Sequence, residues 1–199
     1  MIKSIGIFTF LFIFGCESYI PKNGDIIFHT SKSNQSKAVQ AATRSPYSHM
    51  GIIYLKDKKP YVYEASRTVK ITELNEWINR GKNRKYIVKR LINSDVILTN
   101  DALIKMKEVG KLYEGKPYDL YFEWNDERIY CSELVWKIYK NAIGLEIGKL
   151  ELLKDFNLSS PEVKKKLRER YGENIPENET VISPVSMYNS ELLKTVFEN

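Results

Sequence analysis

The sequence has 199 residues, of which 43% are hydrophobic and 28% are charged, and this balance argues against an intrinsically disordered chain. Lysine and arginine exceed aspartate and glutamate by 31 − 25 = 6, but the basic residues are scattered and form no dense tract of the kind that binds nucleic acid. We therefore expect no nucleic-acid partner and interpret the surplus as a solvated basic surface, with weak attraction to an anionic envelope or membrane as the alternative.

The N-terminus has the pattern of an export signal, because Lys3 is followed by a short apolar run. The run is too short to span a bilayer comfortably, which favours a signal peptide over a membrane helix. It ends in Ile13-Phe14-Gly15-Cys16, which is similar to a bacterial lipobox, where lipid is attached to the cysteine thiol before cleavage. We predict a signal peptide over residues 1–16 and a membrane anchor through lipid on Cys16. A buried N-terminal helix is the alternative.

The single domain over residues 17–199 would then belong to an exported protein of the cell envelope, anchored on the periplasmic or outer-membrane face. If Cys16 is lipidated, Cys131 is the only thiol that remains. An exported chain with one free cysteine cannot use it for an internal disulfide. Cys131 is therefore either buried and inert or chemically active.

Short apolar runs rich in β-branched residues, separated by turn residues, fill the first half of the mature chain. Such runs predict an antiparallel sheet. The runs 49–55 and 60–65 flank a charged tetrapeptide and predict a hairpin with its turn near residues 57–58. Further predicted strands cover 24–28, 69–72 and 86–91, the last of which we expect to close the sheet, and predicted short helices cover 34–43 and 74–79.

Helical patterns dominate the second half. A helix over 99–113 has Thr99 as its cap, and after an aromatic-rich loop a strongly amphipathic helix covers 131–143 and ends at Gly144. The last predicted helix covers 161–171. With no repeats and no linker, the pattern predicts one α+β domain in which a small antiparallel sheet packs against helices.

Cys131 opens the amphipathic helix directly after a long loop. The free amides and the dipole of a first helical turn stabilise a thiolate and lower the pKa of a cysteine. A thiolate is the competent nucleophile, and a nearby histidine would form an ion pair with it. The alternative is an inert core cysteine on an apolar helix face.

His49 begins the first strand of the predicted hairpin, and Gly51 suggests that something packs closely against that strand. A turn near residues 57–58 brings Glu64 opposite Gly51, on the same face as His49 and one diagonal step away. There its carboxylate could accept the imidazole N–H, whereas an unpaired carboxylate in this apolar strand would be costly. An exposed edge glutamate is the alternative. The other histidine, His29, has no carboxylate in register, so we expect it to be structural or exposed.

The chain resembles the circularly permuted papain-like hydrolases of the NlpC/P60 superfamily, and most closely their YiiX/YebB-like branch. The segments that carry the resemblance are 24–28, 38–52, 62–65, 118–119, 130–135 and 182–193. In ordinary papain-like enzymes the cysteine precedes the histidine, whereas here His49 and Glu64 precede Cys131. That order is what a circular permutation of the fold implies.

The resemblance implies that Cys131 is the nucleophile, His49 the general base and then acid, and Glu64 the residue that orients His49. It also implies that Tyr118 lies over the nucleophile and helps to bind substrate or the oxyanion. Asp25 resembles a structural residue of the family.

Two residues depart from the Asp-Cys-Ser-Gly pattern of unpermuted members: Tyr130 stands in place of the aspartate and Glu133 in place of the glycine. We therefore do not transfer the peptidoglycan-peptide specificity of those members directly.

The resulting hypothesis is a cysteine amidase or peptidase of the bacterial envelope that cleaves an amide bond through an acyl-enzyme. Its substrate would be a small peptide, an amino-acid amide or an acyl lipid, with no cofactor and no metal, since two histidines and no cysteine cluster make no zinc signature. A lipid-directed acyltransferase or esterase of the same fold is one alternative, and a non-catalytic module that binds an envelope ligand is the other. The oligomeric state stays open.

Overall fold

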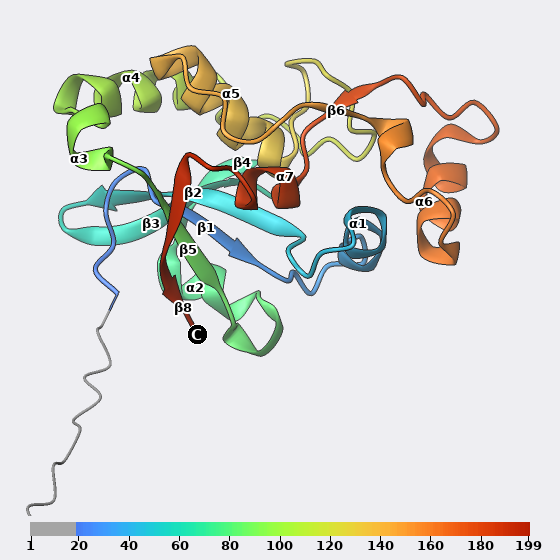
Figure 1. Cartoon of the computed structure of the whole chain (residues 1–199), viewed down its shortest axis with the longest axis horizontal. Helices are drawn as coiled ribbons and strands as arrows, with labels where there is room; N and C mark the ends of the chain where they lie inside the picture. The colour runs from blue at the N-terminus through green and yellow to red at the C-terminus, as the bar shows by residue number, and fades with distance from the viewer. Residues whose placement is uncertain (1–18) are drawn as a thin grey trace, which may run out of the picture.

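The computed structural model describes residues 19–199, so the predicted signal peptide and the predicted lipidation of Cys16 lie outside the described residues. Its centre is a six-stranded antiparallel sheet in the order β4-β3-β2-β1-β5-β8 (Figure 1). The strands of this sheet are β1 (Ile26–His29), β2 (His49–Lys56), β3 (Lys59–Ala65), β4 (Val69–Glu73), β5 (Ile87–Leu91) and β8 (Leu193–Glu198). A separate pair of short strands consists of β6 (Glu151–Leu152) and β7 (Thr180–Val181).

Helices cover both faces of the sheet, with α4 and α5 on one face and α2 on the other (Figure 1). The helices are α1 (Ser36–Thr43), α2 (Leu74–Asn79), α3 (Ser94–Ile97), α4 (Asn100–Lys111), α5 (Cys131–Ile143), α6 (Pro161–Tyr171) and α7 (Pro184–Tyr188), with short 3-10 turns at Lys82–Arg84 and Leu153–Asp155. This arrangement confirms the predicted α+β fold. Within residues 19–199, none of the helices combines the length and the apolar character needed to cross a membrane.

Strand β1 shows why the central runs are apolar throughout. Successive side chains of a strand point to opposite faces of the sheet. Ile26 and Phe28 accordingly pack in the core beneath α5, whereas Ile27 packs in the core closed by Trp77 of α2. Because both faces are covered, neither set of side chains needs to be polar.

The predicted β2–β3 hairpin is present, and its two-residue turn consists of Asp57 and Lys58. Both residues have positive φ, 51° and 63°, as the right-handed twist of a tight hairpin favours. The strands pair with Ile52 opposite Tyr63, so continuing the register places Glu64 opposite Gly51. The register that the sequence predicted is therefore confirmed.

The predicted strand over 86–91 exists as β5, but it does not close the sheet, so that expectation is wrong. Strand β8 pairs with the outer side of β5 and forms the edge. Only Leu193 of β8 is buried, and a single buried side chain leaves no alternation by which the sequence could reveal a strand.

Helices α1 and α6 pack together beside the sheet and away from the main core (Figure 1). Ala38 of α1 and Val163 and Leu167 of α6 form a small separate cluster with Leu153. Because α6 is held here, its other side faces the end of the sheet at which β2 begins. A cleft lies between them.

Candidate active site

Cys131 is the first residue of α5, directly after the N-cap residue Tyr130. Only 3% of the surface of Cys131 is exposed to solvent. A backbone amide in the first turn of a helix has no partner inside that helix, and the positive end of the helix dipole favours a negative charge there. The sulfur therefore lies in the setting that the sequence predicted for a thiolate.

His49 is the first residue of β2, and its Nε2 atom lies 2.6 Å from Oε2 of Glu64 on the neighbouring strand. This contact leaves Nδ1 as the ring nitrogen available to the thiol, and His49 and Cys131 lie close enough to shift each other's pKa. The structure thus brings together the three residues that were singled out from the sequence, in the order cysteine, histidine, carboxylate.

The Glu64 carboxylate is completely buried, with 0% of the residue exposed. Its Oε1 accepts a hydrogen bond from the Thr72 hydroxyl at 2.6 Å. The same oxygen accepts a hydrogen bond from the Arg80 guanidinium, with which it forms an ion pair. Burial raises the pKa of Glu64, but His49, Thr72 and Arg80 together outweigh burial and hold that pKa at about 2. The carboxylate is therefore ionised at neutral pH.

Thr72 and Arg80 were missed by the sequence reasoning. Thr72 had a usable signal, because it lies in a predicted strand one diagonal step from Glu64 across the β3–β4 pair. Arg80 follows α2 and has no periodic relation to the hairpin, so only the folded structure places it on the carboxylate.

The thiol and the imidazole influence each other. Burial raises the pKa of the Cys131 thiol, but the hydrogen bond and charge of His49, the backbone amide of Met50 and the Tyr118 hydroxyl lower it below its usual value. Burial lowers the pKa of His49, yet Cys131 and Glu64 raise it to about 9. Together these shifts favour a thiolate and an imidazolium at neutral pH.

Tyr118 and Cys131 line the same small cavity, and each shifts the pKa of the other, so Tyr118 lies near the thiol. Its backbone N–H donates to the carbonyl of Arg67 at 3.0 Å, which ties the aromatic-rich loop to the β3–β4 turn. Burial and the neighbouring sulfur raise the pKa of Tyr118 well above its usual value. The hydroxyl consequently stays protonated and able to donate.

Asp119 gives this loop its shape. The residue is fully buried, and its carboxylate accepts hydrogen bonds from the amides of Tyr121 at 2.8 Å and Glu123 at 2.6 Å. A carboxylate in this position fixes the turn that follows Tyr118. Asp119 therefore supports the position of Tyr118 without touching the thiol.

His29 is structural, and the alternative that it is exposed is wrong. It is buried at the end of β1, with its ring stacked on Trp77 at a centroid distance of 3.8 Å and 5.3 Å from the ring of His49. Burial and the neighbouring cations lower the pKa of His29 to about 2. The ring is therefore a neutral, flat support beneath His49.

Asp25 and the two departures from the unpermuted pattern have structural partners. Asp25 pairs with Arg90 at 2.6 Å at the start of β1, which agrees with the structural role expected for it. The Tyr130 hydroxyl accepts the amide of Ile182 at 3.1 Å. The third residue, Glu133, pairs with Lys137 along the helix at 2.7 Å.

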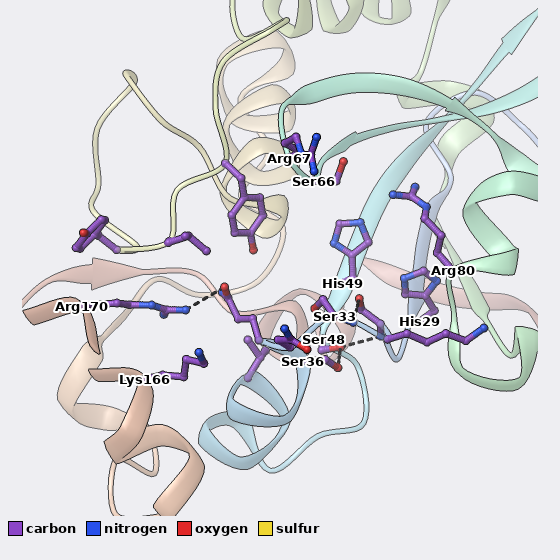
Figure 2. A pocket seen from close by; sticks show the side chains of 18 of the residues that line it. His29, Ser33, Ser36, Ser48, His49, Ser66, Arg67, Arg80, Lys166 and Arg170 are labelled. Atoms are coloured by element: carbon purple, nitrogen blue, oxygen red, sulfur yellow. Dashed lines mark hydrogen bonds between the residues drawn. The ribbon is translucent and has the colours of Figure 1, made fainter. Parts of the chain in front are cut away.

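A cavity of about 850 Å³ opens over His49 and Tyr118 (Figure 2). A second, smaller cavity of about 100 Å³ reaches Cys131 and shares Tyr118 and Ser48 with the first. Its walls are mostly apolar, with Phe122 and Leu167 among them. The thiol is thus reached from a cleft with one polar and one apolar side.

A metal site in a protein needs several donor side chains that converge on one point. Within residues 19–199, no group of three or more histidine, cysteine, aspartate or glutamate side chains is arranged to hold one. The ring of His29, whose centroid lies 5.3 Å from that of His49, is stacked on Trp77.

Comparison with known proteins gives three consistent findings. A family model described as permuted papain-like amidase enzyme, YaeF/YiiX, C92 family, matches residues 20–197. The chain is 49% identical to the uncharacterized protein YiiX of Escherichia coli (strain K12) over 176 residues, which cover 88% of this chain and 86% of that protein. It is also similar to a crystal structure described as metalloprotein yiiX from Escherichia coli O157:H7, with a TM-score of 0.87, 48% identity and coverage of 91% of this chain and 99% of that one.

Proposed function

Because the chain belongs to the permuted papain-like amidase family of YaeF and YiiX, we propose that it is a cysteine amidase or peptidase in which Cys131, His49 and Glu64 form the catalytic triad. Membership of the family supports a cysteine hydrolase. The observation that carries the proposal for the triad is that Nε2 of His49 lies 2.6 Å from the Glu64 carboxylate, while His49 and the neighbouring Cys131 thiol shift each other's pKa.

The first step is attack on the amide. The Cys131 thiolate adds to the carbonyl carbon, so that a carbon–sulfur bond forms and the carbonyl electron pair moves onto oxygen. In this proposal the backbone N–H of Cys131 and the Tyr118 hydroxyl donate to this oxyanion. Such donors stabilise the charge that develops in the transition state.

In the rest of the reaction His49 first gives up a proton and then takes up another. The imidazolium gives its Nδ1 proton to the leaving nitrogen as the carbon–nitrogen bond breaks, which leaves a thioester on Cys131. His49 then takes a proton from water, and the resulting hydroxide attacks the thioester and releases the acid and the thiolate. Glu64 holds the ring through Nε2 during both transfers and stabilises its charged form.

The proposed location is the bacterial envelope, with a lipid anchor on Cys16 and a substrate that is a small peptide or an amino-acid amide. This part rests on the N-terminal pattern of the sequence alone. Labelling of intact cells with radioactive palmitate tests the anchor: incorporation is expected in the natural chain and lost in Cys16→Ser, and equal incorporation in both would contradict it.

A lipid-directed acyltransferase or esterase is the second candidate, and one observation favours it. The small cavity that reaches Cys131 has mostly apolar walls, which would suit an acyl chain. A non-catalytic binding module is the third candidate. The contact of imidazole with carboxylate and the mutual pKa shifts of imidazole and thiol argue against a mere binding role, which needs none of these groups to be paired in this order.

The relative described as a metalloprotein raises the question of a metal here. Because residues 19–199 hold no cluster of three donors, the described residues do not fit such a site. We therefore assign no step of the reaction to a metal ion.

Substrate profiling of purified residues 17–199 tests the proposal. Muropeptides, simple amino-acid amides and an acyl lipid are offered in parallel to the natural chain and to Cys131→Ala. Amide cleavage that depends on Cys131 is expected. Transfer or hydrolysis of the acyl lipid without any amide cleavage would instead establish the second candidate.

A further inference from the structure

Most of the charged side chains that line the larger cavity over His49 are basic. Five of the charged side chains that line it are basic and one is acidic: Lys32, Arg67, Arg80, Lys166 and Arg170, with Glu169 as the acid. The whole chain carries 31 basic and 25 acidic side chains. The cavity is therefore far more basic than the chain average, which the scattered sequence positions did not indicate.

Two of these five cations already have carboxylate partners. Arg80 is paired with Glu64 behind the cavity, and Lys166 is paired with Glu169 at 2.5 Å. Arg170 instead donates to the side-chain oxygen of Gln35 at 3.0 Å, and Lys32 donates to a backbone carbonyl.

Among the residues that the structure describes, three that line the cavity therefore have no carboxylate in ion-pair contact. Within the described part of the chain, no carboxylate lies within 4.0 Å of the charged nitrogens of Lys32, Arg67 or Arg170. An anion that enters the cavity could therefore pair with them.

Two of these cations come from different elements around the cavity. Arg67 comes from the turn between β3 and β4 and Arg170 comes from α6, and in Figure 2 both lie to the left of His49. The carbonyl of Arg67 also holds the amide of Tyr118. A substrate that enters this cavity consequently meets positive side chains near His49.

We propose that the substrate carries an anionic group, a carboxylate or a phosphate, close to the amide that is cleaved, and that Arg67 and Arg170 bind this group. The inference rests on the proposed role of Cys131 as nucleophile. Guanidinium groups bind carboxylate and phosphate with paired hydrogen bonds, and they do so best where water is partly excluded. A cationic substrate would meet repulsion from the same side chains, so the cleft selects by charge.

Two alkylating reagents test the charge of the cleft without knowledge of the substrate. Iodoacetate and iodoacetamide react alike: the thiolate forms a sulfur–carbon bond and iodide leaves with the electron pair of the carbon–iodine bond. They differ in that the first carries a carboxylate and the second a neutral amide. The rate with iodoacetate is divided by the rate with iodoacetamide at Cys131. This ratio, divided by the same ratio for N-acetylcysteine amide, reports the local preference for an anion.

We expect this normalised ratio to be roughly ten at low salt, because a cleft of one charge concentrates ions of the opposite charge. It should fall towards one as salt is added, since surface charges are screened. Arg67→Gln and Arg170→Gln should each lower it about two- to fivefold, the effect of one partly exposed charge. Arg168→Gln is the matched control, because Arg168 is exposed on the same helix and does not line the cavity; its ratio should equal that of the natural chain.

Protection experiments separate the two kinds of anion. N-acetylglutamate and inorganic phosphate are each added during labelling with iodoacetamide. Protection by N-acetylglutamate alone assigns the site to a carboxylate, and protection by phosphate alone assigns it to a phosphate. Protection by both supports an anion site that does not distinguish them, and protection by neither counts against the inference.

The failure of this inference differs from the failure of the proposed function. If Cys131 reacts with neither reagent faster at pH 6 than a free thiol does, the catalytic role of Cys131 is wrong. If iodoacetamide reacts rapidly but the normalised ratio is one or less and does not respond to salt or to Arg67→Gln, Cys131 keeps its role and the anionic substrate is overturned.

Discussion

His49 and Glu64 lie on neighbouring strands of one hairpin, with Nε2 of His49 2.6 Å from the Glu64 carboxylate. Backbone pairing alone brings them together, because the register that places Ile52 opposite Tyr63 puts both side chains on the same face of the sheet. The thiol comes to this pair from a different element, the start of α5. Several measurements follow from this division.

Replacing the sulfur tests the nucleophile. Cys131→Ser should lower kcat for amide hydrolysis by at least about 10³-fold, the loss seen when a triad nucleophile is removed, because a hydroxyl is far harder to ionise than this thiol. The free energy of unfolding should change by less than about 1.5 kcal/mol, since the substitution nearly conserves volume. Hydrolysis within tenfold of the natural rate would rule out Cys131 as the nucleophile.

The pH dependence of activity should show the thiolate–imidazolium pair. The pKa of Cys131 is lowered and that of His49 is raised to about 9, so the reactive form exists between the two values. The rate kcat/KM should rise as Cys131 loses its proton and fall as the pH passes about 9 and His49 loses its own. In Glu64→Gln the alkaline limb should move to lower pH, because one of the two charges that raise the pKa of His49 is gone; an unmoved limb would contradict the pairing.

Arg80 should act on stability through Glu64. The pKa of Glu64 is about 2 in the folded protein and 4.5 ordinarily. Its ionised form therefore stabilises the fold above about pH 4.5, and this stabilisation is lost as the pH falls from 4.5 towards 2. Arg80→Gln should raise the folded-state pKa and flatten this part of the stability curve.

At pH 7 the same variant should lose about 1–2 kcal/mol of unfolding free energy, towards the lower end for a charged hydrogen bond. The Arg80 side chain is 36% exposed, so water screens part of the interaction. Urea unfolding at several pH values measures both effects. A curve parallel to that of the natural chain between pH 2 and 4.5 would show that Arg80 does not act through Glu64.

Gly51 should not tolerate a side chain. A Cβ atom there would lie 2.5 Å from a methyl of Val62 and 2.7 Å from the carbonyl oxygen of Tyr63, so the two strands would have to separate. Gly51→Ala should cost about 1–3 kcal/mol of unfolding free energy, as overpacking does, and should also slow labelling of Cys131 because His49 is displaced. Gly115→Asn is the control, since Gly115 has open space around it and a left-handed φ of +79° that asparagine accepts.

Tyr118 separates oxyanion binding from thiol activation. Tyr118→Phe should lower kcat by about 10²-fold, the lower range for loss of one oxyanion donor. The pKa of Cys131, measured from the pH dependence of iodoacetamide labelling, should rise, because the Tyr118 hydroxyl is one of the groups that lower it. Unchanged kcat would remove Tyr118 from the proposed mechanism.

The sequence by itself determined the parts of the site that depend on local order. Helix α5 begins at Cys131 and ends before Gly144, as its apolar periodicity and terminal signals predicted. The hairpin turn at residues 57–58 was sufficient to place Glu64 beside His49. A turn and a period of two residues set a register over a few residues, so no distant contact is needed to deduce it.

Tertiary structure alone decided the groups that come from separate elements. It brought Arg80 onto Glu64, stacked His29 on Trp77, added β8 outside β5, and gathered Arg67 and Arg170 around one cleft. These residues are far apart along the chain, and their contacts depend on how whole helices and strands pack. Residue spacing carries no signal for such packing, whereas it does for the turn and the helix that hold His49, Glu64 and Cys131.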